Sequence, residues 1–196
     1  MKTKLFFIFF MAAICCHVFS QTIKISNGVL FSNTTDRQKE FMNKMITSYS
    51  FLVGLDYLEH KYYYLSSEIG YTKLGGKENE AYIDATRVSV YETWDYIQAN
   101  TMFRIRYPIN FFHVYVGFGP KIDFLLENQK IKSDFLKDMP GLNRVNVGAK
   151  VEMGISNDFK RMRIGLNYSY GFNFMSIGSG LYNYQHSVML SVGYKL

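Results

Sequence analysis

Residues 112–126, FHVYVGFGPKIDFLL, alternate strictly between two kinds of side chain. The even positions are apolar and mostly bulky, whereas the odd positions are mostly small, polar or charged. Successive side chains of a β-strand point to opposite faces. This stretch therefore predicts a strand with one apolar face and one polar face.

The same two-residue period recurs along the rest of the chain. Eight segments follow it, at residues 22–32, 47–58, 62–74, 94–107, 112–126, 144–155, 161–174 and 184–196. Their connections alternate in length: those at 59–61, 108–110 and 156–160 are short, and those at 33–45, 75–91, 127–143 and 176–180 are mostly longer and polar. Short turns at one end and longer loops at the other are typical of outer-membrane barrels. The sequence predicts an all-β fold, an eight-stranded antiparallel up-and-down transmembrane β-barrel.

The number of apolar side chains decides which face of this barrel points outward. An eight-stranded barrel is just wide enough inside for side chains to fill, so roughly forty Ile, Val, Leu, Tyr and Phe side chains cannot fit there. They cover the outside instead, with Val151 and Ile164 expected near the bilayer midplane. Aromatic residues make up 17% of the chain, as expected where strand ends meet a lipid–water boundary. A soluble β-sandwich is the structural alternative.

Residues 1–20 have the composition of a cleaved signal peptide, which leaves residues 21–196 as one outer-membrane β-barrel domain. The basic start, the apolar run and the small residues of the cleavage site are Lys2 with Lys4, 5–14, and Val18 with Ser20. Both cysteines lie in this segment, so the mature protein has no disulfide and no thiolate metal site. A lipoprotein is the alternative, although neither cysteine follows a small residue as a lipid acceptor should. The expected location is the outer membrane of a Gram-negative bacterium.

Charge and composition also limit the partners. The formal net charge of +6 falls to +4 when Lys2 and Lys4 are removed, and the remaining basic residues are scattered. No clustered basic patch supports nucleic-acid binding. The expected partners are outer-membrane lipid, the barrel-assembly machinery during biogenesis, and a protein partner at the extracellular loops. In the third long loop, Phe135, Leu136 and Met139 either form such a docking surface or fold over the barrel mouth.

Six ionisable residues of the polar face are expected to form a paired network in the lumen, with a structural role. They are Asp56, Glu68, Arg104, Lys150, Glu152 and Arg163. Charged groups in a sealed interior are costly unless they are paired. We expect Glu152 beside Arg163, across the short turn at 156–160, and Glu68 beside Arg104. A narrow ion path is the alternative, which the small number of strands disfavours.

No residue pattern indicates catalysis or cofactor binding. The mature histidines, His60, His113 and His186, belong to no His-x-Ser pattern and to no cluster with metal-ligand spacing. The adjacent glycines Gly75 and Gly76 lack the helix that a phosphate-binding loop needs. The sequence predicts a non-enzymatic protein without a metal or cofactor, in a structural or surface-interaction role.

Five short motifs together resemble the PorT-like group of small outer-membrane β-barrel proteins of Gram-negative bacteria. They are GVLFS at 28–32, WDYIQ at 94–98, VYVGFGP at 114–120, LNYSYG at 166–171 and LSVGYKL at 190–196. Members of this group often end in Phe, from which Leu196 departs. The resemblance implies the barrel fold and the outer-membrane location. It also implies an alternative role as an accessory component of a protein-secretion system, and a third alternative is an outer-membrane lipid-modifying enzyme.

Overall fold

The computed structural model describes residues 21–35, 42–83, 86–126, 143–176 and 180–196. The expected signal peptide at 1–20 lies outside the described residues. Most of the third long loop also lies outside the described residues. This includes Phe135, Leu136 and Met139, which are expected either to dock a partner or to fold over the barrel mouth.

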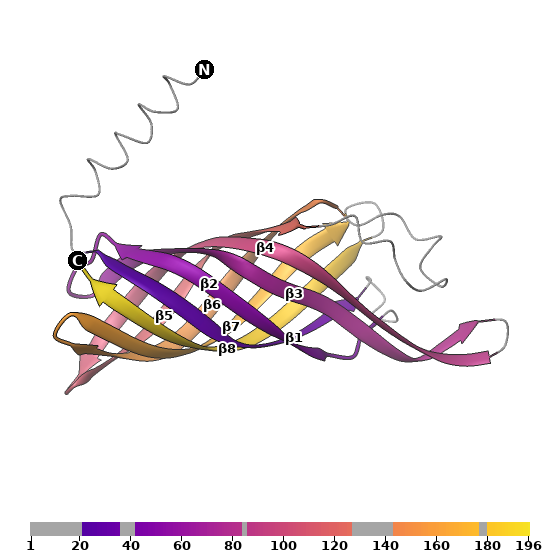
Figure 1. Ribbon diagram of the computed structural model, residues 1–196, viewed down its shortest axis with the longest axis horizontal. Helices are drawn as coiled ribbons and strands as arrows, with labels where there is room; N and C mark the ends of the chain where they lie inside the picture. Colours follow the sequence, from indigo (N-terminus) through magenta and orange to yellow (C-terminus); the bar gives the residue numbers. More distant parts are fainter. Residues whose placement is uncertain (1–20, 36–41, 84–85, 127–142, 177–179) are drawn as a thin grey trace, which may run out of the picture.

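Eight antiparallel strands form a closed barrel in the order β1-β2-β3-β4-β5-β6-β7-β8 (Figure 1). The strands are β1 (Thr22–Thr35), β2 (Ile46–Tyr57), β3 (Tyr63–Ile83), β4 (Thr86–Ile109), β5 (Phe112–Leu125), β6 (Val145–Phe159), β7 (Met162–Ser176) and β8 (Leu181–Lys195). The ring closes between the first and last strands, where Thr22 lies opposite Lys195. The eight-stranded up-and-down prediction is confirmed, and the β-sandwich alternative is wrong because a sandwich has no such closure.

The three short turns gather at one end of the barrel, here called the short-turn end (Figure 1). Strand β1 begins there and β8 ends there. Each turn contains one residue with a positive φ: Leu58 at 52°, Asn110 at 52° and Lys160 at 49°. A left-handed residue reverses the chain within a few positions. The opposite end, which holds the other connections, is called the long-loop end.

The described residues of 75–91 form strands and not a loop, so this part of the sequence prediction is wrong. Strands β3 and β4 continue through it as a hairpin, with Lys77 opposite Tyr91 and Tyr82 opposite Arg87. Figure 1 shows this hairpin projecting beyond the ends of the other strands. A strand pair that leaves the barrel has water on both sides and needs no apolar face. Alternation therefore gives no signal for it.

The outer wall is apolar, as the alternation predicts. Val116, Phe118 and Val151 expose 55%, 57% and 51% of their surface on this wall. Val151 lies at the middle of β6. The expectation for Ile164 is wrong, because it is only two residues from the start of β7 and lies close to the short-turn end. Among the described residues, no helix is long and apolar enough to cross a membrane.

Candidate functional site

The six predicted charged residues lie inside the barrel, and each exposes 6% of its surface or less. Alternation places them there, because each occupies an inward position of β2, β3, β4, β6 or β7. The structure links all six through ion pairs of 4.0 Å or less. Together with Lys24 and Glu59 they form what we call the charged plug.

Arg104 and Asp56 are the centre of the charged plug. The Nε atom of Arg104 donates a hydrogen bond to Glu152 Oε1, and its Nη1 lies 3.6 Å from Asp56 Oδ1. The expected neighbour Glu68 is also present, with 4.0 Å between its Oε2 and Nη2 of Arg104. Asp56 further pairs with Lys24, whose Nζ lies 3.1 Å from Oδ1. These residues come from five different strands, so their pairing joins the barrel across its lumen.

Lys150 and Lys24 surround Glu68 from two sides. Lys150 Nζ lies 3.9 Å from Glu68 Oε2 and 3.9 Å from Glu152 Oε2. Lys24 Nζ lies 3.0 Å from Glu68 Oε1 and donates a 2.7 Å hydrogen bond to Ser66 Oγ. Each buried carboxylate therefore faces at least one cation, the arrangement that offsets the cost of removing charge from water.

The expected pairing of Glu152 with Arg163 is wrong. The register places Arg163 opposite Asp158 and Glu152 opposite Ser169, six positions further along β7. At about 3.3 Å per residue this separation is roughly 20 Å. Arg163 instead contacts Asp56, with 3.1 Å between Nη1 and Oδ2, and Asp158, with 2.8 Å between Nε and Oδ1.

Glu59 belongs to the charged plug although the sequence pattern predicts a turn at 59–61. Its Oε2 lies 2.8 Å from Nη2 of Arg163 and 3.4 Å from Nη1 of Arg106, and its Oε1 accepts a 2.8 Å hydrogen bond from Thr22. The side chain is 4% exposed. It folds back into the short-turn end of the lumen, which two-residue alternation cannot indicate for a residue outside a strand.

A buried tyrosine packs against the two arginines of the charged plug and against Arg106. The Tyr64 ring centroid lies 5.7, 5.3 and 5.5 Å from the guanidinium carbons of Arg104, Arg106 and Arg163. Tyr115 makes a similar contact, 5.1 Å from that of Arg104. Guanidinium groups are attracted to aromatic faces. These rings fill the space between the charges and hold the arginines in place.

Above the charged plug, towards the long-loop end, a second ion pair is completely buried. Lys121 Nζ lies 3.1 Å from Asp123 Oδ2, and both side chains are 0% exposed. The amide of Asn173 also donates to Asp123 Oδ2. This layer continues the polar filling of the lumen.

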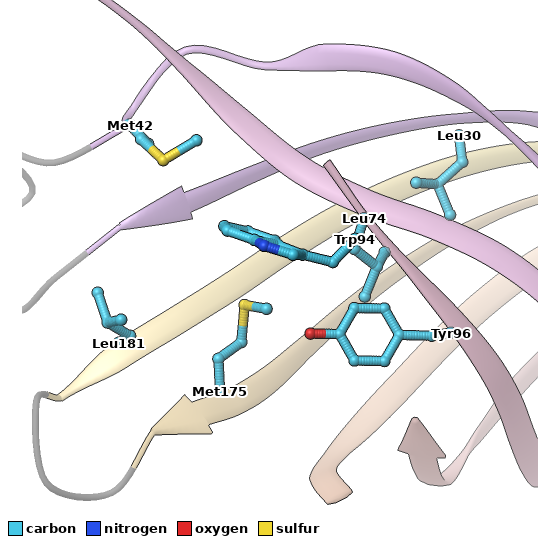
Figure 2. Packing of buried hydrophobic residues seen from close by; sticks show 7 residues of the cluster. All are labelled: Leu30, Met42, Leu74, Trp94, Tyr96, Met175 and Leu181. Atoms are coloured by element: carbon cyan, nitrogen blue, oxygen red, sulfur yellow. The ribbon is translucent and has the colours of Figure 1, made fainter. Parts of the chain in front are cut away.

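Apolar side chains fill the lumen at the long-loop end, and we call this cluster the apolar plug (Figure 2). Its members are Leu30, Met42, Leu74, Trp94, Tyr96, Met175 and Leu181, none more than 4% exposed. Leu74 lies opposite Trp94 on the paired strands β3 and β4. Alternation does not indicate this plug. Leu30, Leu74, Trp94 and Tyr96 lie on the face that is polar elsewhere along the strands, and the other members lie outside the strands predicted from the sequence.

Little empty space remains inside the charged plug. A cavity of about 10 Å³ is lined by residues that include Lys24, Asp56, Tyr64, Tyr115 and Ser156. This volume holds no more than one water molecule. Nor do the described residues include any group of three or more His, Cys, Asp or Glu side chains arranged to bind a metal ion.

The register does bring one histidine opposite a serine, a juxtaposition that spacing in the sequence could not reveal. His113 on β5 faces Ser156 on β6. Among the described residues no hydrogen bond joins them. Ser156 lines the lumenal cavity of about 10 Å³ and also an outward pocket of about 320 Å³. A catalytic serine needs a bonded base and space for a substrate. The pair lacks the bonded base.

We expect Gly148→Ala to lower the free energy of unfolding by about 1–3 kcal/mol through overpacking. A methyl group at Gly148 would overlap the backbone carbonyl oxygen of Phe172 and the side chain of Asn173. Gly165→Ala is the matched control, because its nearest neighbour is the movable Ser191 hydroxyl at 2.7 Å. Urea unfolding in lipid vesicles measures both variants. Equal losses for the two would contradict the crowding argument.

Comparison with known proteins supports the fold. No protein-family model matches the sequence, and no curated protein matches it. Among solved structures, the chain is similar to outer membrane protein OprG from Pseudomonas aeruginosa, with 9% identity, a TM-score of 0.57, and coverage of 90% of this chain and 96% of that chain. Neisserial surface protein A gives 8% identity, a TM-score of 0.55, and coverage of 89% and 97%. The attachment invasion locus protein Ail of Yersinia pestis, in complex with the heparin analogue sucrose octasulfate, gives 14% identity and a TM-score of 0.51. The match covers 91% of this chain and 99% of that chain.

The fold is that of a small eight-stranded outer-membrane barrel. At these identities the three likenesses establish the fold alone. The resemblance to the PorT-like group rests on the five sequence motifs, because no family model matches.

Proposed function

We propose that the protein is a non-enzymatic outer-membrane barrel with a closed lumen, which anchors the β3–β4 hairpin at the cell surface for interaction with other molecules. The observation that carries this proposal is the filling of the lumen by two successive plugs, one charged and one apolar. A barrel filled in this way offers no path for solutes through its lumen. Its outer wall and its two ends are therefore the surfaces available for function.

The outer wall supports insertion into a membrane. Exposed large apolar side chains recur on the outward positions of the strands, for example Ile25, Val53, Phe118 and Val147. Soluble monomers rarely expose contiguous apolar patches larger than a few hundred Å². A lipid bilayer would cover these apolar side chains. Lipid offers no hydrogen bonds to backbone N–H and C=O groups, but in a closed barrel these groups pair with one another.

Export of the chain completes the proposal. A signal peptide at 1–20, cleaved before Gln21, directs the protein to the envelope, and the barrel-assembly machinery inserts it with the long-loop end outside. Both described chain ends then lie on the periplasmic side with the short turns (Figure 1). The His113 and Ser156 pair does not support a lipid-modifying reaction, because among the described residues no hydrogen bond joins the two side chains.

The experiment that tests this function is conductance in planar bilayers. We expect the wild-type barrel, inserted from lipid vesicles, to give no ohmic current above the lipid baseline, because both plugs block the lumen. Heat-modifiable migration on a gel verifies that the inserted protein is folded. Steady ohmic conductance of the folded barrel would refute the closed lumen and restore the ion path.

We expect removal of residues 79–90, replaced by a tight turn, to leave the barrel folded. In the part of the chain that the structure describes, the strand residues beyond the Lys44–Lys77 bridge pair only with each other. The free energy of unfolding should change by less than about 1 kcal/mol, as for surface changes in general. Loss of heat-modifiable migration would show instead that the hairpin is required for assembly.

The same variant tests the surface role. Binding of a host or bacterial surface partner to intact cells should fall when the hairpin is removed, while the amount of barrel in the outer membrane stays the same. Co-purification of the wild type with secretion components, unaffected by removal of the hairpin, would favour the accessory role that the PorT-like motifs imply.

A further inference from the structure

A pocket on the outside of the barrel remains unexplained by the closed lumen. It has a volume of about 610 Å³ and lies over β1, β7, β8 and the segment before β2. Its lining includes Asn33, Asn43, Met45, Tyr170, Tyr184 and His186. This lining combines amides, phenols and an imidazole, whereas the other outward pockets lie among mainly apolar side chains.

The aromatic part of the pocket is held in a fixed arrangement. The rings of Tyr170 and Tyr184 are stacked, with centroids 6.4 Å apart and planes inclined by 18°. The His186 ring lies 5.0 Å from that of Tyr170, and its Nδ1 forms a 2.5 Å hydrogen bond with the Tyr168 hydroxyl. Since Nδ1 is engaged, Nε2 is the histidine atom that can meet a ligand.

The amide part of the pocket contains an acceptor without a partner. Asn33 Nδ2 donates to the Asn43 carbonyl at 3.2 Å, which fixes the orientation of the amide. Its Oδ1 is buried and has no hydrogen-bond partner among the described residues. An unsatisfied carbonyl is costly, and more so beside lipid, where no water can replace the missing donor. Because Oδ1 is buried, a ligand hydroxyl or N–H group satisfies it only if the side chain turns toward the pocket.

The depth of the pocket identifies the kind of ligand. Directly below it on β8, Val188 and Leu190 expose 44% and 54% of their surface to the hydrocarbon, and on β1 Phe31 exposes 37%. The pocket therefore lies at the upper edge of the apolar wall, where polar headgroups begin. Its lining holds no Asp, Glu, Lys or Arg side chain. A neutral polyol fits this lining better than an isolated anionic group does.

We propose that this pocket binds the sugar headgroup of an outer-leaflet glycolipid, whose acyl chains lie along Val188 and Leu190. The apolar C–H face of a sugar ring packs on the tyrosine rings. Its hydroxyls reach His186 Nε2 and, once the side chain turns toward the pocket, the Asn33 amide. Tyrosine suits such a boundary, because it offers an apolar body and a polar tip. The inference rests on the proposed membrane insertion, with the long-loop end in the outer leaflet.

The test measures lipid retained by the full barrel in native mass spectrometry after release from nanodiscs. The probes are lipid A, dephosphorylated lipid A, and phosphatidylglycerol, which is anionic but has no sugar. We expect the wild type to retain both forms of lipid A at least about tenfold better than phosphatidylglycerol, equivalent to about 1.4 kcal/mol. Equal retention of phosphatidylglycerol, or loss of retention on dephosphorylation, would overturn sugar recognition.

Two pocket variants and one control locate the site. Asn33→Leu and Tyr184→Leu should each reduce retention of lipid A severalfold, and both keep the outer wall apolar. Tyr107→Leu makes the same change at an outward tyrosine near the short-turn end, 64% exposed, and should retain lipid A as the wild type does. Unchanged retention in both pocket variants would overturn the assignment.

A free saccharide is the competing source of the same chemistry. A soluble glucosamine disaccharide at millimolar concentration should fail to displace lipid A, because the acyl chains add to the binding. Complete displacement would overturn the glycolipid assignment. Failure of the barrel to enter nanodiscs, read by heat-modifiable migration, would count against the proposed membrane insertion and is distinct from failure to bind the sugar.

Discussion

Glu152→Gln is expected to lower the free energy of unfolding of the barrel by about 3–5 kcal/mol, as for other buried ion pairs that lose one partner. The carboxylate accepts a hydrogen bond from Nε of Arg104 and lies 3.9 Å from Lys150 Nζ. Its removal leaves two buried cations with less compensation. Urea unfolding in lipid vesicles measures the loss, and Trp94, the single tryptophan of the chain, provides the fluorescence signal.

The double variant Glu152→Gln with Arg104→Gln separates pairing from simple crowding. Two residues in direct contact should give a coupling free energy of about 0.5–3 kcal/mol, so the double variant should lose less than the two single variants together. Strict additivity would contradict the pairing. Lys73→Gln is the control, because Lys73 pairs with Asp95 at 3.4 Å on the outer wall and is 38% exposed. Such partly exposed pairs contribute about 0–1 kcal/mol.

The inward and outward positions could be predicted from the sequence, whereas the partners of the charged residues could not. Facing repeats every two residues, so a strand such as β5 shows it without reference to any other strand. Pairing across the lumen depends on strand tilt and stagger, which are properties of the closed barrel. Arg104 on β4 therefore contacts Glu152 on β6 and Asp56 on β2, neither on an adjacent strand.

The expected neighbours within one hairpin show the same limit. The turn after β6 fixes the pairing of Asp158 with Arg163, and this leaves Glu152 far along the strand. Counting along the two strands from the turn would have given this result, because register in a hairpin follows from loop length. Glu68 and Arg104 do meet, since Arg104 lies opposite Tyr64 and its long side chain spans the remaining distance.

The features that the sequence did not indicate lie where alternation has no physical cause. The β3–β4 hairpin projects beyond the ends of the other strands (Figure 1), and Glu59 reaches the lumen from a turn. The apolar plug reverses the usual polarity of an inward face at the long-loop end. Its large side chains, such as Trp94 and Leu74, exclude water from a mouth that would otherwise be open.

Val151→Arg is expected to cost about 2–4 kcal/mol of folding free energy, the range for a basic residue that faces lipid near the bilayer midplane. Val151 is 51% exposed on the outer wall, between Phe118 on β5 and Tyr170 on β7. An arginine at this position has no partner and lies far from both headgroup regions. Urea unfolding in lipid vesicles measures the change, and Val151→Leu controls for size because it keeps the position apolar.

Ile164→Arg provides the comparison in depth. Ile164 is 41% exposed on the same wall, but it lies close to the short-turn end, where the arginine can extend to the headgroups. The cost there should fall to about 0–1 kcal/mol, as it does near membrane interfaces. Equal costs at the two positions would mean that the outer wall does not face a bilayer across its middle. A cost at Val151 no larger than that of Val151→Leu would show that the side chain faces water.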